Sequence, residues 1–182
     1  MLKLPNALII VGTNRNAGKT TLACDIISRF SSPENITAIK ISPHFHPLDD
    51  DALIVEKNKD FVIVRESKQG TEKDSSRMLD AGANEVYYIQ VWDRNIEKAF
   101  RTLLKHIDSS APLVCESGWL RTVVEPGLFL ILNRKGNIDV KKSISGYKKL
   151  SHQWIEFDGE RFDKGLEKIT IENNSWKIKD QS

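Results

Sequence analysis

The feature that most constrains the fold is an apolar run that leads directly into a glycine-bounded loop and then into a helical pattern. Residues 7–11 read ALIIV, and such a continuous apolar run is typical of a strand buried on both faces of a parallel sheet. The loop spans residues 12–18, and apolar residues at helical spacing follow from residue 18 to about residue 30. The sequence therefore predicts a strand, a loop and a helix as the first unit of an α/β domain.

Strand and helix patterns alternate along the rest of the chain. Apolar residues at helical spacing follow Asp74 and, more clearly, Asp93, so each aspartate is predicted to cap a helix. The polar, acidic segment 42–60 is predicted to be a loop. This alternation predicts a three-layer α/β fold with a mostly parallel sheet. Strands are expected at residues 36–41, 61–65, 85–91, 112–116 and 128–132.

The length predicts one compact domain. The chain has 182 residues and 40% hydrophobic content, which is enough for one sizeable core and short for two domains. Residues 1–136 are the expected core, and residues 137–182 differ from it in carrying short strand patterns. We expect them to form a small C-terminal β appendage packed on the same domain. Its strands are expected at residues 153–157, 169–171 and 175–178.

Charge and hydropathy argue against large classes of partner. The formal net charge is +2 with both signs interspersed, so nothing in the overall charge favours nucleic acid or a membrane surface. A basic stretch at residues 134–149 is interpreted as a solvated helix or loop, because it lacks interleaved aromatic residues. The apolar start is too short for a signal peptide, and no 18-residue apolar run follows. Together with Cys24 and Cys115, interpreted as reduced core residues, this predicts a cytoplasmic protein.

The residues around Gly18 have the chemistry that a phosphate group needs. Gly18 lets the backbone approach an anion, and the amide N–H groups of the loop and of the helix start surround it. Lys19 is expected to reach the terminal phosphates of a nucleotide, and the Thr20 hydroxyl to coordinate Mg²⁺. The strict motif G-x-x-x-x-G-K-[ST] wants glycine at Thr13, whereas here it is Gly12. The residues predicted to bind the phosphates are Thr13, Asn14, Arg15, Asn16, Ala17, Gly18, Lys19, Thr20 and Thr21.

Two further charged residues end predicted strands at the edge where α/β sheets bind ligands. Glu116 is expected to hold Mg²⁺ or its water, which makes Lys19 and Glu116 the candidate catalytic residues and Thr20 and Glu116 the candidate metal ligands. Its alternative role is that of a strand-end glutamate facing water. Lys40 either contacts a phosphate or a substrate carboxylate, or is simply solvated.

The sequence leaves open which nucleotide base is bound and whether a second metal site exists. Asn133 lies where guanine-binding P-loop proteins carry N-K-x-D, but Gly136 stands in place of the aspartate, so GTP and ATP both remain open. Asp139 is the nearest acid that could replace it. Two histidines and three aspartates form either a metal cluster or a polar loop bounded by prolines. They are His44, His46, Asp49, Asp50 and Asp51.

Several segments resemble known P-loop families. The phosphate loop, with its early glycine, resembles that of dethiobiotin synthetase. Residues 38–40 (AIK), 73–77 (KDSSR) and 81–83 (AGA) resemble, in the same order, motifs of the molybdopterin-guanine dinucleotide biosynthesis protein B family. The resemblance covers roughly residues 7–133. It implies a P-loop NTPase fold, places Asp74 among the nucleotide-binding residues, and implies a homodimer and a cofactor-biosynthesis protein as partner.

Three functional hypotheses follow. The first is a slow, Mg²⁺-dependent NTPase that uses GTP or ATP and assists molybdenum cofactor biosynthesis. The second is an ATP-dependent ligase similar to dethiobiotin synthetase, in which Lys40 helps to hold a substrate carboxylate. The third is a non-catalytic adaptor that binds a nucleotide in order to position its loops for a partner protein.

Overall fold

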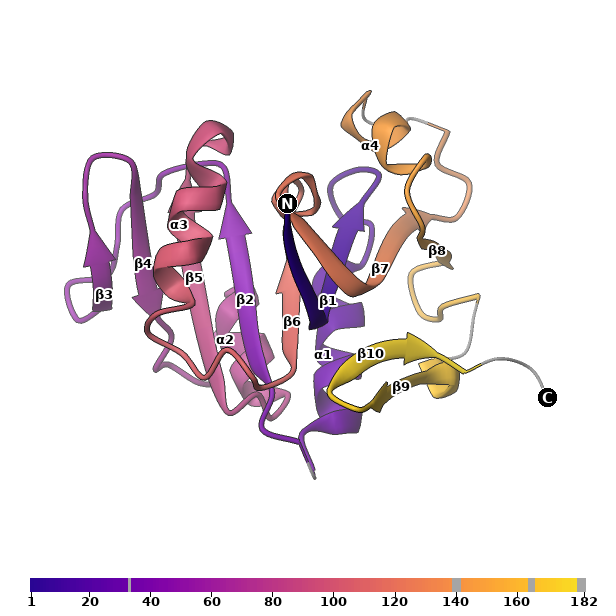
Figure 1. Cartoon of the computed structure of the whole chain (residues 1–182), viewed down its shortest axis with the longest axis horizontal. Helices are drawn as coiled ribbons and strands as arrows, with labels where there is room; N and C mark the ends of the chain where they lie inside the picture. Colours follow the sequence, from indigo (N-terminus) through magenta and orange to yellow (C-terminus); the bar gives the residue numbers. More distant parts are fainter. Residues whose placement is uncertain (33, 139–141, 164–165, 180–182) are drawn as a thin grey trace.

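A twisted eight-stranded sheet forms the middle layer of the protein (Figure 1). The computed structural model describes residues 1–32, 34–138, 142–163 and 166–179. The strand order is β3-β4-β5-β2-β6-β1-β7-β8; the six strands from β5 to β8 in that order are parallel, and the β3–β4 hairpin joins β5 antiparallel. The predicted α/β class and mostly parallel sheet are confirmed. The strands are β1 (Leu2–Gly12), β2 (Thr37–Ser42), β3 (Leu53–Lys57), β4 (Phe61–Arg65), β5 (Glu85–Val91), β6 (Leu113–Glu116), β7 (Val124–Arg134) and β8 (Gln153–Phe157).

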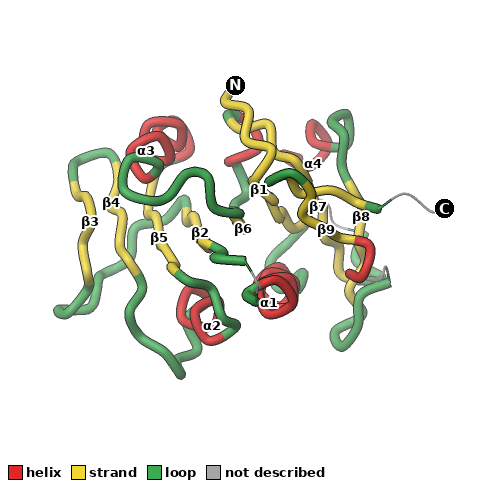
Figure 2. The backbone as a smooth tube through the Cα atoms, turned by 60° about the horizontal axis from the view of Figure 1, so that its bottom comes forward, coloured by secondary structure: helices red, strands yellow, loops and turns green. Residues whose placement is uncertain are grey.

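Helices cover both faces of the sheet (Figure 2). Helices α1 and α2 pack on one face together with a separate antiparallel hairpin, β9–β10, and helices α3 and α4 pack on the other. Two apolar clusters, one on each side of the sheet, make up the core. No helix in the described part of the chain has the length and apolar character needed to cross a membrane. The bounds are α1 (Lys19–Phe30), α2 (Asp74–Asp80), α3 (Ile96–Leu103), α4 (Lys142–Tyr147), β9 (Ile169–Glu172) and β10 (Ser175–Ile178), with 3-10 turns at Asp93–Asn95, Leu120–Thr122 and Leu166–Lys168.

The first strand lies in the interior of the sheet, between β6 and β7, as its continuous apolar run predicts. Leu8 and Ile10 face the cluster under α1, whereas Ile9 and Val11 face the cluster under α3, and none of the four is more than 2% exposed. Because both faces of β1 are buried, the loop that follows it is held at the carboxyl edge of the sheet.

Two strands differ from the sequence prediction. Strand β3 lies inside segment 42–60, predicted to be a loop. Its apolar residues follow one another and do not alternate with polar ones, and its pairing with β4 shifts register between Ile54 and Glu56. Strand β8 pairs parallel with β7 and completes the main sheet, so the appendage consists of the β9–β10 hairpin and not of β8. Ile155 and Phe157 explain this placement, because both are buried in the cluster under α1.

The predicted helix caps are wrong at both positions. Helix α2 begins at Asp74 itself, the capping position belongs to Lys73, and no side chain caps this helix. Asp93 opens a 3-10 turn, and α3 begins only at Ile96. Asp74 is therefore available for a different contact, which lies at the functional site.

Both cysteines, and Tyr147 of the basic stretch at residues 134–149, are wholly or partly buried. Cys115 is fully buried and Cys24 is half-buried; burial raises the pKa of both thiols, that of Cys24 to about 11, so both stay protonated at neutral pH. In the basic stretch Tyr147 is buried, and the Lys148 ammonium lies 4.8 Å from the centre of the Trp154 ring. The residues 139–141 of this stretch lie outside the described part of the chain.

We predict that the β9–β10 hairpin contributes strongly to stability through Trp176. This side chain is fully buried and packs edge-on against Phe30 of α1, with ring centres 5.1 Å apart. Trp176→Ala should lower the free energy of unfolding by about 3–5 kcal/mol, measured by urea denaturation. Trp92→Ala is the matched control, because Trp92 is 48% exposed and its loss should cost less than about 1 kcal/mol. Equal losses in the two variants would contradict the prediction.

Candidate functional site

The loop of residues 12–18 turns tightly enough that the Lys19 side chain folds back over its first residue. A Cβ atom on Gly12 would lie 2.8 Å from Cδ of Lys19 and 3.2 Å from Cβ of Ala17. Any side chain at position 12 would therefore displace the lysine stem. This contact explains why position 12 is a glycine, although the strict motif would place the glycine at Thr13.

Thr13 and Asn133 make a buried contact with each other. The Thr13 hydroxyl donates to Oδ1 of Asn133 at 2.7 Å, and the Thr13 N–H donates to the carbonyl of Leu132 at 2.9 Å. Both side chains are buried, at 0% and 5% exposure. They tie the start of the loop to the end of β7, a structural role that the motif did not predict. Asp139, the acid considered as a substitute base reader, lies outside the described residues.

Gly18 sets the conformation of the last loop residue and the start of α1. Its φ of 91° lies in the left-handed region, and a Cβ atom there would overlap the Phe157 ring of β8. Helix α1 begins with no side-chain capping bond and no acidic residue in its first turn. The first-turn N–H groups have no acceptor within the helix, and the positive end of the helix dipole faces the loop. This helix start is therefore suited to an anion.

A buried carboxylate, Glu116, organises the charges beside this helix start. Lys40 and Glu116 occupy paired positions on the adjacent strands β2 and β6, and Glu116 is only 2% exposed. Its Oε1 accepts a hydrogen bond from Lys40 Nζ at 2.5 Å, and its Oε2 accepts one from the Thr20 hydroxyl at 2.8 Å. Lys19 Nζ lies 3.9 Å from Oε1, and Lys40 Nζ also donates to Asp74 Oδ2 at 2.6 Å. Lys40 is thus the cation between two carboxylates.

The pKa values follow from this arrangement. Burial acts to lower the pKa of Lys40, but the Glu116 and Asp74 charges outweigh it and hold that pKa above its ordinary value. Burial acts to raise the pKa of Asp74, but the Lys40 charge and the hydrogen bonds from Lys40 and Thr20 together outweigh it and hold that pKa below its ordinary value. The ammonium and the carboxylate are both charged at neutral pH.

A cavity of about 420 Å³ opens over this network, and we call it the loop cavity. Arg77 and Phe157 line it although the sequence analysis did not select them. Helix spacing is the signal that points to Arg77, because it lies three residues after Asp74 on α2. Parallel pairing is the signal that points to Phe157, because the end of β8 lies at the same sheet edge as the ends of β1 and β7. Thr13, Asn14, Ala17 and Asn133 do not line it. The predicted residues that it brings together are Arg15, Asn16, Gly18, Lys19, Thr20, Thr21, Lys40, Asp74 and Glu116.

The histidine and aspartate residues after β2 do not gather around one point. The rings of His44 and His46 lie 6.3 Å apart, and Asp49 pairs instead with Lys68 and Lys73. Among the described residues, no group of three or more His, Cys, Asp and Glu side chains is close enough to hold a metal ion. Of the metal ligands predicted from the sequence, Thr20 and Glu116 lie side by side.

We predict that the Lys40 ammonium occupies the place beside Glu116 that a metal cation would take. Lys40→Met removes one partner of a buried ion pair and should lower the free energy of unfolding by up to about 3–5 kcal/mol. Added Mg²⁺ or Mn²⁺, without nucleotide, should raise the melting temperature of this variant more than that of the wild type, because a divalent ion can replace the lost charge.

Lys73→Met is the matched control for this experiment. Lys73 also pairs with an aspartate beside α2, but its side chain is 55% exposed. Its loss should leave both stability and the response to metal ions close to wild type. If Lys40→Met is no more sensitive to divalent ions than the wild type, the lysine does not stand in for a metal.

Comparisons with known proteins found no relative of this chain: no protein-family model, no curated protein and no solved structure matches it. The function of the site must therefore be inferred from its own residues and from the sequence motifs that they carry.

Proposed function

We propose that this chain is a P-loop protein that binds Mg²⁺ together with GTP or ATP in the loop cavity and hydrolyses the nucleotide slowly. One observation carries the proposal. The uncapped start of α1, the Lys19 side chain and the Thr20–Glu116 pair all face one cavity. We further propose that nucleotide binding and hydrolysis by this protein assist the assembly of a cofactor of the molybdopterin-guanine dinucleotide type, which is what the resemblance of the sequence motifs implies.

The phosphate groups are recognised by two kinds of positive charge. The N–H groups at the α1 start donate to phosphate oxygens from fixed positions, and the helix dipole adds to their effect. Lys19 lies over Gly12 at the mouth of the same loop and reaches the terminal phosphates as a point charge. Arg15 and Arg77 line the same cavity and add further positive charge. This balance of charges favours a polyphosphate over a neutral ligand.

Magnesium is held by Thr20 and Glu116. Mg²⁺ keeps several waters and needs only one or two protein ligands besides the phosphates, so the absence of a larger acidic cluster among the described residues is consistent with it. A metal ion held there would compete with the Lys40 ammonium for the Glu116 carboxylate, and Lys40 would keep its hydrogen bond to Asp74. Lys40 lines the same cavity, so its ammonium would be within the site that receives the phosphate groups.

Hydrolysis at such a site depends on charge stabilisation and needs no covalent nucleophile. Water attacks the terminal phosphorus while the bond from that phosphorus to the bridging oxygen breaks and the nucleoside diphosphate leaves. Lys19 and the helix start balance the negative charge that develops on the phosphate oxygens, and a bound Mg²⁺ would supply further positive charge. Glu116 contributes by holding the metal or its water.

The experiment that tests the proposal is the removal of the Lys19 charge. Lys19→Ala should abolish nucleotide binding measured by calorimetry with Mg²⁺ and GTP or ATP, because its main partner is the phosphate anion. The variant should remain folded. Lys98→Ala is the control: this lysine lies on α3, across the sheet from α1, and pairs with Asp60. Wild-type nucleotide affinity in Lys19→Ala would refute the phosphate-binding role of the loop.

The base preference gives a second prediction. A guanine-specific site needs a carboxylate that accepts from the base, and leaving those donors unpaired costs roughly 1–3 kcal/mol. Gly136 offers no carboxylate, and Asn133 already accepts a hydrogen bond from Thr13. GTP and ATP should therefore bind within about tenfold of each other, a difference of about 1.4 kcal/mol. Competition of ATP against a fluorescent GTP analogue measures this, and a much larger preference for GTP would point to another acid such as Asp139.

A further inference from the structure

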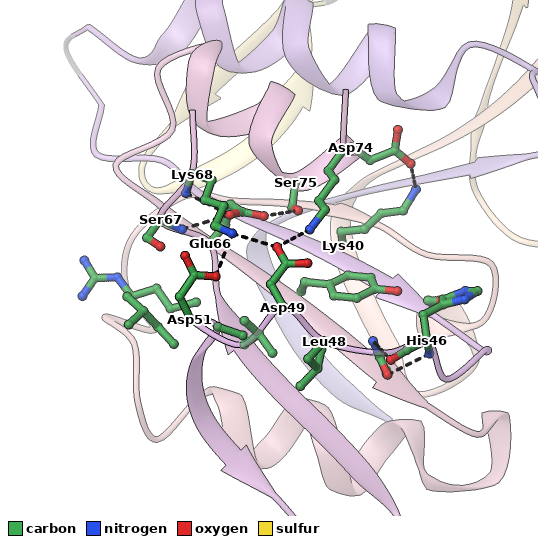
Figure 3. Close-up of a pocket in the computed structure, with 18 of the residues that line it drawn as sticks. Lys40, His46, Leu48, Asp49, Asp51, Glu66, Ser67, Lys68, Asp74 and Ser75 are labelled. Carbon is green, nitrogen blue, oxygen red and sulfur yellow. Dashed lines mark hydrogen bonds and ion pairs between the residues drawn. The ribbon is translucent and has the colours of Figure 1, made fainter. Parts of the chain in front are cut away.

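A second cavity of about 420 Å³ adjoins the loop cavity, and we call it the hairpin cavity (Figure 3). Its floor is the face of the sheet just beyond the start of α2, where β2, β4 and β5 contribute Lys40, Val64, Tyr88 and Gln90. The segment between β2 and β3 lies over this floor. Lys40 and Asp74 line both cavities, so this ion pair is a wall that the two share.

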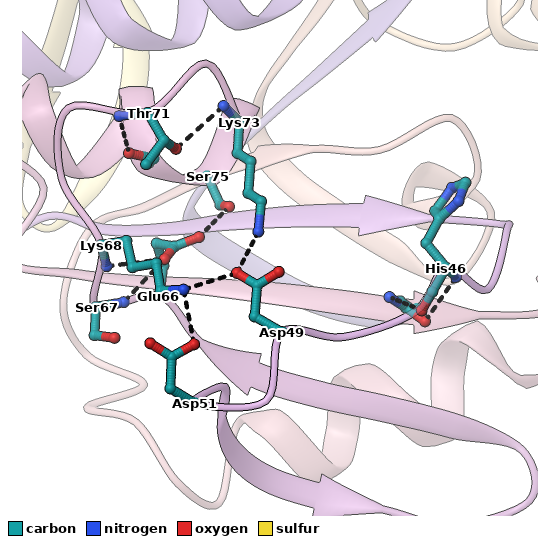
Figure 4. Close-up of polar contacts among 11 residues, drawn as sticks. His46, Asp49, Asp51, Glu66, Ser67, Lys68, Thr71, Lys73 and Ser75 are labelled. Atoms are coloured by element: carbon teal, nitrogen blue, oxygen red, sulfur yellow. Dashed lines mark hydrogen bonds and ion pairs between the residues drawn. The ribbon is translucent and has the colours of Figure 1, made fainter.

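The segment over the hairpin cavity is anchored at both ends (Figure 4). Gln90 is buried, and its side-chain amide donates to the His46 carbonyl at 3.1 Å and accepts from the His46 N–H at 3.2 Å. Farther along, Asp49 accepts from Lys73 at 2.6 Å and from Lys68 at 3.0 Å. The buried Gln90 amide holds the roof over the floor, and the exposed ion pairs of Asp49 add weaker contacts farther along the segment.

The charges that line the hairpin cavity are balanced and already paired. It has four basic side chains and four carboxylates. Lys40 pairs with Asp74, Arg65 with Glu85 outside the cavity, and the two remaining lysines with Asp49 and Asp51. The Glu66 carboxylate accepts from the Ser75 hydroxyl and from two backbone N–H groups. A charged ligand would compete with these contacts, whereas an uncharged ligand would not.

The uncharged part of the lining has both apolar and hydrogen-bonding members. Leu48, Ala52 and Val64 provide apolar surface, and Ser42 and Tyr88 carry hydroxyl groups. A cavity of this volume has the size of sites that hold small organic molecules. Its lining therefore matches a molecule with an apolar body and a hydrogen-bonding edge.

We propose that the hairpin cavity binds a small uncharged molecule that has an apolar body and at least one hydroxyl or amide group. The binding of this molecule does not depend on the function proposed for the loop cavity. Only its position beside nucleotide phosphates rests on that proposed function. Because Lys40 and Asp74 form a wall of both cavities, filling one changes the affinity of the other, and the coupling is the same in both directions.

Three probes of matched size test the chemical class: benzyl alcohol, benzoate and benzylamine. Titrations without nucleotide, followed by amide ¹H–¹⁵N chemical shifts, should locate benzyl alcohol at residues such as Ala52, Val64 and Tyr88. Benzyl alcohol should bind at least about fivefold more tightly than either charged probe, because each charged probe displaces an ion pair. Tighter binding of benzoate or benzylamine, or shifts located elsewhere, would overturn the proposal.

Ala52→Phe fills the cavity from its roof and should weaken benzyl alcohol binding at least about fivefold. Ala111→Phe is the matched control, because Ala111 lines neither cavity, and it should bind the probe like the wild type. Undiminished binding in Ala52→Phe, with wild-type shifts at Tyr88, would place the probe outside the cavity and overturn the proposal.

Nucleotide titrations separate this inference from the proposed function. If the probe binds in the cavity but Mg²⁺ with GTP or ATP does not bind at all, the proposed function fails and the hairpin cavity stands. If the nucleotide binds and no uncharged probe does, the hairpin cavity fails and the proposed function stands. If both bind, saturating nucleotide should change the affinity of benzyl alcohol by at least about threefold.

Discussion

The Glu116 carboxylate, buried at the end of β6, is the group on which the arrangement of the site depends. A buried carboxylate is costly unless cations and hydrogen-bond donors surround it. Lys40 comes to it from the neighbouring strand β2, and Thr20 comes from the first turn of α1. Lys40 in turn requires Asp74 at the start of α2. One buried charge thus fixes how two helices meet the carboxyl edge of the sheet.

The two glycines that bound the loop after β1 are required by side chains outside the loop. Gly12 leaves room for the stem of Lys19, and Gly18 leaves room for the Phe157 ring, which arrives on β8 from the far end of the chain. Strand β8 is therefore part of the site as well as of the sheet. The proposed phosphate site consequently depends on the C-terminal third of the chain, although every residue of its motif lies near the amino terminus.

The antiparallel β3–β4 hairpin extends the sheet beyond β5 and gives this side of the molecule a second cavity. Without the segment between β2 and β3, the floor formed by Val64, Tyr88 and Gln90 would lie open beyond the start of α2. Lys40 and Asp74 line both cavities. If Lys40 moved away from Glu116 on metal binding, as proposed, the lining of both cavities would change. A nucleotide-binding protein with a second ligand could link the two by this pair alone, with no larger change of shape.

The sequence by itself determined the α/β class, the mostly parallel sheet, and the strand, loop and helix around residues 7–30, because continuous apolar runs and helical spacing are local signals. It also selected Lys40 and Glu116, because charged residues at the ends of parallel strands lie at one sheet edge, and it selected Lys19 through the phosphate-loop motif and Asp74 through the family resemblance. Only the tertiary structure decided that Thr13 binds Asn133, that Asp74 pairs with Lys40 and does not cap α2, and that β3 and β8 join the main sheet. These outcomes depend on partners from 34 to 120 residues away in the chain or on strand pairing at the sheet edges, and no local pattern encodes which partner a side chain or a strand edge will meet.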